Sequence, residues 1–98
     1  MVYVLVHHKV SDYRHWRSVF DAALELRQKS GERGCRVFRS AGDPNQLTLL
    51  FEWEDLQQAQ RYMTSAELRR KMEEAGVEGA PEIQYLGEMY TVRRSAAD

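Results

Sequence analysis

Two adjacent histidines, His7 and His8, are the residues whose chemistry stands out in this sequence. Imidazole titrates near neutral pH, so either ring could take a proton from a bound molecule as a general base. Adjacent residues on a strand point to opposite faces, so one metal ion could not be held by both. Alternation groups His8 with four valines, which favours the helix-covered side for His8 and the other side for His7. For each, the alternative is a structural histidine held by a hydrogen bond.

Glu52 is a third catalytic candidate. It lies on an apolar segment beside Trp53, where partial burial could shift the pKa of a carboxylate. The alternative is an ordinary carboxylate paired with a nearby Arg or Lys. Glu54, two residues further on, adjoins the start of a helix, where the helix dipole alone favours a negative charge.

Four aromatic side chains are candidates for binding a flat ligand: Tyr3, Phe51, Trp53 and Tyr85. Tyrosine is amphipathic and serves equally well in a subunit interface. Apolar alternation along this segment turns Trp53 towards the helices as a core residue. If the central strands align at their ends, Trp53 lies opposite Val2 and Tyr3, more than roughly 10 Å from His7 at about 3.3 Å per residue.

These residues lie on alternating strand and helix patterns. Period-two alternation predicts strands, and apolar residues at spacings of three and four predict helices. Gly31 is expected to end the first helix. The predicted strands are 2–10, 35–41, 46–54 and 83–92, and the predicted helical regions are 13–30 and 56–75, with a break at 64–65.

The order β-α-β-β-α-β is typical of the ferredoxin-like α+β fold. It predicts a four-stranded antiparallel sheet with the first and third strands in the centre and both helical regions on one face. Residues 1–92 are expected to form this single domain, and residues 93–98 a disordered tail.

Composition limits the function. The chain has 98 residues, 43% of them hydrophobic, and a formal net charge of -1, which favours one small soluble domain and gives no reason to expect binding to nucleic acid or membrane. Cys35 is the only cysteine, so no internal disulfide can form, and the cytoplasm is the expected compartment. No metal-binding or cofactor-binding motif is present, so no cofactor is expected.

Both faces of the predicted sheet carry aliphatic and aromatic side chains. An antiparallel sheet with one face in water should have a clean polar set there. A contiguous apolar face indicates an interface or a ligand groove. We therefore expect a homodimer in which two sheets pack face to face.

Several short motifs of the sequence resemble those of the dimeric α+β barrel superfamily, and within it those of small proteins of the antibiotic-biosynthesis-monooxygenase type. They are HKVSDY with Trp16 and Phe20 (8–20), RVFR (36–39), DPN (43–45) and LFEWEDL (50–56). The resemblance extends from Val2 to about Tyr90. It implies the barrel dimer, and it implies that Trp53 can line the cavity, as in the haem-degrading branch, which is the alternative to its core role. The superfamily includes cofactor-independent oxygenases, haem-degrading enzymes and proteins with no established reaction. The axial histidine of the haem-degrading branch has no counterpart in residues 66–75, which argues against haem unless His7 or His8 is the ligand.

The functional expectation has two forms. In the first, the dimer binds a small apolar or aromatic compound, polyketide-like for example, and oxidises it without a cofactor, with His7 or His8 as the base. In the second, the protein is a non-catalytic binding or assembly module with structural histidines and aromatics. A closed pocket of more than about 300 Å³ would favour the first.

Overall fold

The structure is a computed structural model that describes residues 1–93. Its strands are β1 (Val2–Val10), β2 (Glu32–Arg39), β3 (Gln46–Trp53) and β4 (Val77–Gly87), and its helices are α1 (Tyr13–Ala22), α2 (Leu24–Ser30), α3 (Leu56–Met63) and α4 (Ala66–Glu74). Arg93 follows β4 outside any helix or strand. The rest of the tail predicted for 93–98 lies outside the described residues.

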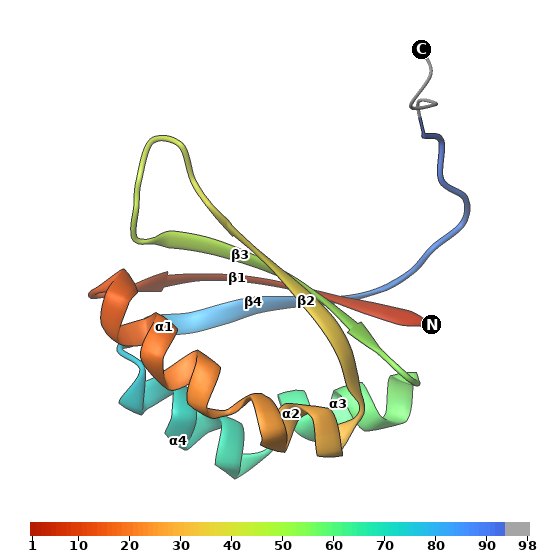
Figure 1. The fold of residues 1–98 in the computed structure, drawn as a ribbon, viewed down its shortest axis with the longest axis horizontal. Coiled ribbons are helices and arrows are strands. Elements are labelled where there is room, and N and C mark those ends of the chain that lie inside the picture. Colours follow the sequence, from red (N-terminus) through yellow and green to blue (C-terminus); the bar gives the residue numbers. More distant parts are fainter. Residues whose placement is uncertain (94–98) are drawn as a thin grey trace.

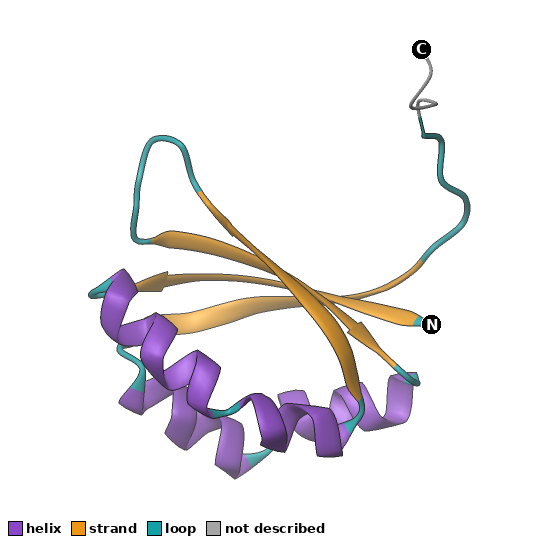
Figure 2. Ribbon diagram, viewed as in Figure 1, coloured by secondary structure: helices purple, strands orange, loops and turns teal. Residues whose placement is uncertain are grey.

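The four strands form one antiparallel sheet in the order β2-β3-β1-β4. All four helices lie against the same face of this sheet, and within residues 1–93 no helix lies on the other face (Figure 1, Figure 2). The predicted ferredoxin-like α+β fold, with β1 and β3 in the centre, is confirmed.

Alternation along the two central strands sets which side chains reach the core. On β1 the buried residues are Val4, Val6, His8 and Val10, and on β3 they are Leu47, Leu49, Phe51 and Trp53. These residues face the helices, while their neighbours, His7 and Glu52 among them, face the uncovered side. The orientation inferred for His8 from its valine neighbours is therefore confirmed.

The first helical region is broken, whereas the sequence predicts one helix over 13–30. Ala23 has φ -91° and ψ 4° and separates α1 from α2. The carbonyl of Phe20 accepts hydrogen bonds from Arg27 Nη1 at 2.5 Å and from the Ala23 N–H at 3.2 Å. These two donors occupy the carbonyl at the point where a continuous helix would use it for the next turn. Gly31 ends α2 with φ +117°, as predicted.

The edge strands differ from the prediction. β2 runs over 32–39 rather than 35–41, and β4 over 77–87 rather than 83–92. β4 ends at Gly87 because its partner β1 has its first paired residue, Val2, directly opposite. It begins six residues early because the turn formers at 79–81 lie within an irregular part of this edge strand rather than ending it, and edge strands tolerate proline.

Candidate functional site

His8 is buried in the helix-covered layer without a hydrogen-bond partner. The residue is only 7% exposed, and neither Nδ1 nor Nε2 of its ring has a hydrogen-bond partner among the described residues. The ring lies edge-on to Trp16 of α1, with centroids 5.9 Å apart. Buried polar atoms are nearly always paired, so two unpaired nitrogens on one ring indicate a place where a bound molecule could donate a hydrogen bond.

A cavity of about 60 Å³ adjoins His8 between the sheet and the helices. Its wall is mainly apolar and aromatic and includes Trp16, Phe20, Phe51, Tyr62 and Met72. The volume is several times what one water needs, but well below the roughly 300 Å³ at which ordinary ligand pockets begin. Neither this cavity nor a second one, of about 160 Å³ on the far side of α4, reaches the size expected for a closed ligand pocket.

Burial lowers the pKa of His8 from 6.5 to about 4, and the neighbouring His7 acts in the same direction. The main cause is desolvation, which penalises the charged imidazolium. His8 is consequently neutral at pH 7 and can accept a proton. An anionic group on a ligand beside the ring would raise this pKa again, because an opposite charge favours the protonated form.

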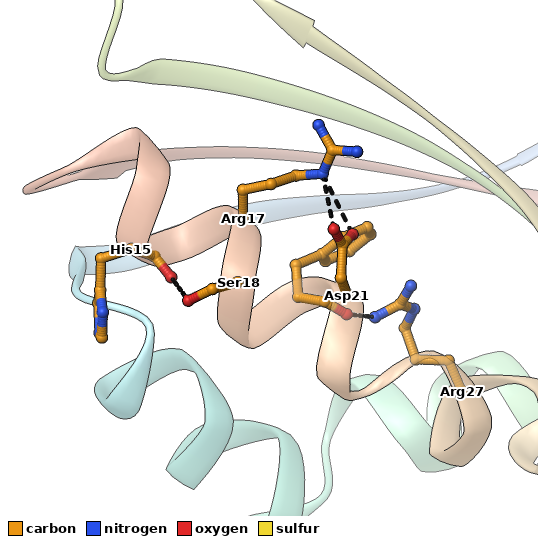
Figure 3. Close-up of polar contacts among 6 residues, drawn as sticks. His15, Arg17, Ser18, Asp21 and Arg27 are labelled. Carbon is orange, nitrogen blue, oxygen red and sulfur yellow. Dashed lines mark hydrogen bonds and ion pairs between the residues drawn. The ribbon is translucent and has the colours of Figure 1, made fainter.

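Arg27 is a buried charged residue in the cavity wall. It is only 4% exposed, its Nε donates to Glu32 at 2.7 Å, and its guanidinium lies 3.7 Å from the centre of the Phe20 ring. The same side chain donates to the Phe20 carbonyl (Figure 3). Phe20 stacks in turn on Trp16 with centroids 4.7 Å apart. His8 and Arg27 therefore lie at the two ends of a row of stacked rings.

The other helix-side candidates have different positions. Phe51 lines the cavity together with His8. Trp53 is fully buried beside Tyr62, with centroids 5.3 Å apart and its Nε1 unpaired among the described residues, but it is not part of the cavity wall. Tyr85 is half-buried against the core, where burial raises the pKa of its phenol. The core interpretation of Trp53 is confirmed.

Three candidates lie on the uncovered face. His7 Nδ1 is 2.8 Å from Thr48 Oγ1, and Tyr3 donates to Glu88 at 3.2 Å, a contact that raises the pKa of the phenol. Glu52 lies directly opposite Tyr3. Within residues 1–93 no Lys or Arg lies within ion-pair distance of Glu52. The structure therefore separates His7, Tyr3 and Glu52 from His8 by the thickness of the sheet.

Sequence reasoning did not include Arg27 among the site residues. Arg27 and Phe20 lie on different helices, because the break at Ala23 separates α2 from α1, so helical spacing does not relate them. The sequence carries no local signal for their contact.

Neither a metal centre nor a membrane span is found in residues 1–93. No group of three or more His, Cys, Asp or Glu side chains there could hold a metal ion. None of the helices in the described part is long and apolar enough to cross a membrane.

The fold and the buried site together define a small α+β protein with an apolar pocket under its helices. The family model for antibiotic biosynthesis monooxygenase matches residues 2–74, and the chain belongs to this family. No curated protein matches the sequence.

Solved structures with the same fold include three that illustrate its range. A Bordetella bronchiseptica protein, provisionally named an antibiotic biosynthesis monooxygenase, has a TM-score of 0.75 at 17% identity, covering 91% of this chain and 97% of that one. SnoaB, a cofactor-independent oxygenase from Streptomyces nogalater, has a TM-score of 0.69 at 15% identity, covering 99% of this chain and 97% of that one. A conserved protein from Methanosarcina mazei has a TM-score of 0.68 at 18% identity, covering 87% and 89%.

Proposed function

We propose that this protein is a cofactor-independent oxygenase that binds a small apolar or aromatic compound in the cavity beside His8. The observation that carries the proposal is the His8 ring itself, buried at a cavity with both nitrogens unpaired among the described residues. Membership of the monooxygenase family and the likeness to SnoaB are consistent with it. Phe51 contributes to the binding wall, and Trp53 and Tyr85 support that wall from the same side of the sheet.

His8 acts as the general base in this proposal. One ring nitrogen takes a proton from an activated CH₂ of the substrate, and the resulting carbanion passes one electron to dioxygen. The two radicals combine to a peroxide anion, and protonated His8 returns its proton to give the hydroperoxide. The hydroperoxide then loses its second C–H proton together with hydroxide, as water, and leaves a carbonyl. The balance is one CH₂ and one O₂ converted to one C=O and one H₂O, so no external reductant is needed.

The apolar wall supports this chemistry in two ways. It holds a flat substrate against Trp16 and Phe51, which fixes the carbon to be attacked relative to His8. It also excludes water, so that the carbanion meets dioxygen before it is reprotonated. The neutral state of His8, which follows from its pKa of about 4, keeps the base available across the physiological range.

We also propose that the protein works as a homodimer in the cytoplasm, joined through the uncovered sheet face. Leu5 and Leu50 lie opposite each other at its centre, and Phe38 and Leu86 are exposed beside them. Beyond β4, three further apolar side chains are more than 80% exposed: Met89, Tyr90 and Val92. Apolar side chains exposed on a face and on the adjoining segment are typical of an interface. Tyr3, His7 and Glu52 would then be interface residues rather than parts of the pocket.

A non-catalytic ligand-binding or assembly module is the second candidate. The observation that favours it is the small cavity, which at about 60 Å³ is largely filled by its own aromatic wall. In this alternative His8 is a structural residue, and the apolar layer serves stability alone.

Oxygen uptake distinguishes the two candidates. The purified protein is incubated with a panel of hydroxylated aromatic compounds of one to three rings, and dioxygen consumption is followed with an electrode. Stoichiometric uptake of one O₂ per ketone formed, without added metal or flavin, supports the oxygenase. Binding of panel members with no uptake above the uncatalysed rate would favour the binding module instead.

A further inference from the structure

A second cavity lies on the far side of α4 from His8. It has a volume of about 160 Å³ and is bounded by α4 and by Pro81 and Ile83 of β4. Thr64, Ser65 and Arg69 supply its polar groups. The side chains that line both this cavity and the one beside His8 are Met63, Leu68 and Met72. Among residues 1–93 these three side chains are the ones that both cavities have in common, so they lie between the two as a partition.

The cavity beside His8 is too small for an aromatic ligand as it stands. A dry cavity of about 150 Å³ is known to accommodate one benzene ring, whereas this one measures about 60 Å³. Any ring that reaches His8 must displace part of the wall. Which part moves depends on how tightly each side chain is held.

Leu68 and Met72 lie in the less buried part of the wall. The aromatic part of the wall is fixed by ring contacts, because Trp16 stacks on Phe20 and Tyr62 packs against Trp53. By contrast, α4 contributes no fully buried residue, and Leu68 and Met72 are only half-buried. Methionine is unbranched with three rotatable side-chain bonds, so Met72 can leave its position at low cost.

The backbone of α4 is fixed at both ends. At its start Ser65 accepts a hydrogen bond from the Leu68 N–H at 3.1 Å, and at its end the Glu74 carbonyl lies 2.7 Å from Nε2 of His15. His15 projects from α1 towards α4 in Figure 3. Side-chain rotation is therefore an easier way to join the cavities than displacement of the whole helix.

We propose that Leu68 and Met72 determine ligand size by dividing one elongated site into two cavities. Their side chains retract when a ligand extends from His8 past α4 to Pro81 and Ile83. This inference rests on the proposed function only in placing the ligand at His8. It assigns the second cavity to the distal end of that ligand, and it makes the partition the specificity-determining element.

Binding of two probes tests the partition. Phenol has one ring and 2-naphthol has two, and the affinity of each is measured by calorimetry for the wild type, Met72→Ala and Leu68→Ala. Leu56→Ala is the matched control, because Leu56 is an exposed side chain of α3 that lines neither cavity. Circular dichroism and thermal unfolding establish that each variant is folded.

The expected result is a rise of at least tenfold in the ratio of 2-naphthol to phenol affinity in Met72→Ala, a smaller rise in Leu68→Ala and no change in Leu56→Ala. Met72→Phe, which enlarges the partition, is expected to lower the ratio. Should Met72→Ala fail to fold, Met72→Val takes its place with a rise of at least threefold expected. A ratio that stays within twofold of wild type, or no binding of either probe to any variant, overturns the proposal.

This readout is independent of turnover. A changed affinity ratio without oxygen uptake supports the partition while contradicting the oxygenase. Oxygen uptake, together with the same affinity ratio in the wild type and in Met72→Ala, supports the oxygenase while contradicting the partition.

Discussion

The ring of His8 meets the ring of Trp16 edge-on, at an interplanar angle of 69° and a centroid distance of 5.9 Å. His8 is placed there by the alternation of β1, and Trp16 by the periodicity of α1. The contact joins the sheet to the helical layer at the edge of the cavity. It orients the imidazole by packing alone, because neither ring nitrogen has a hydrogen-bond partner among the described residues.

The burial of His8 predicts a specific pH dependence of stability. Its pKa is about 4 in the folded protein and 6.5 when the chain is unfolded, so between these values the unfolded state binds more protons. The contribution of neutral His8 to the free energy of unfolding is therefore complete above pH 6.5 and is lost as the pH falls towards 4. Urea unfolding at pH 7 and pH 4.5 should differ by roughly 2 kcal/mol more in the wild type than in His8→Leu. Equal pH dependence in both proteins would show that His8 is not desolvated.

Gly31 is predicted to tolerate no side chain. Its φ of +117° is unfavourable for other residues, and a Cβ there would lie 2.5 Å from Gln58 Oε1 and 3.2 Å from Trp53 Cε3. Gly31→Ala should lower the free energy of unfolding by about 2 kcal/mol, through strain and overpacking. Gly42→Ala is the control, since a Cβ at Gly42 would have no described atom within 4 Å, and it should change stability by less than about 0.5 kcal/mol. A similar loss of unfolding free energy in both variants would contradict strain and overpacking at Gly31 as the cause.

The buried ion pair between Arg27 and Glu32 predicts that the stability losses of substitutions at the two residues do not add. Both side chains are about 95% buried or more, with Nε and Oε1 2.7 Å apart. Glu32→Leu leaves the Arg27 charge without its counterion, Arg27→Met does the same to the Glu32 charge, and each should cost about 3 kcal/mol. The double variant Arg27→Met/Glu32→Leu removes both charges and should lose less than either single variant. A double-mutant cycle by urea denaturation measures this, and simple addition of the two single losses would contradict it.

The proposed dimer predicts that a charged substitution weakens dimerisation on the uncovered sheet face but not on the helical side. Leu50→Glu places a charge at the centre of the uncovered sheet face, opposite Leu5, and should weaken dimerisation at least a hundredfold. Leu24→Glu makes the same change at an exposed position of α2 and should leave the dimer intact. Sedimentation equilibrium at micromolar concentration gives both results. A monomeric wild-type protein would contradict the interface altogether.

The sequence was sufficient for the fold and for one part of the site. The valines around His8 indicated the face it occupies, and Gly31 indicated the end of α2. The break at Ala23 was not predictable, because it depends on the Arg27 guanidinium reaching the Phe20 carbonyl. The end of β4 was not predictable from its own residues either, because it is set by where its partner β1 begins.

The site itself was predicted less completely. His7 and His8 are equivalent in chemical type, and only the position of the helices distinguishes them. Arg27 was not selected because its charge is typical of a surface position, whereas Glu32 compensates for its burial here. Pairing between such residues is a tertiary property that a local pattern does not contain.

The most direct test of the oxygenase proposal compares the two adjacent histidines. Oxygen uptake is measured with the best compound of the aromatic panel for the wild type, His8→Gln and His7→Gln. If both variants remain dimeric, His8→Gln should lose at least a hundredfold in kcat/KM, and His7→Gln should change it less than threefold. Retention of more than half the activity in His8→Gln, or an equal loss in both variants, would contradict His8 as the base.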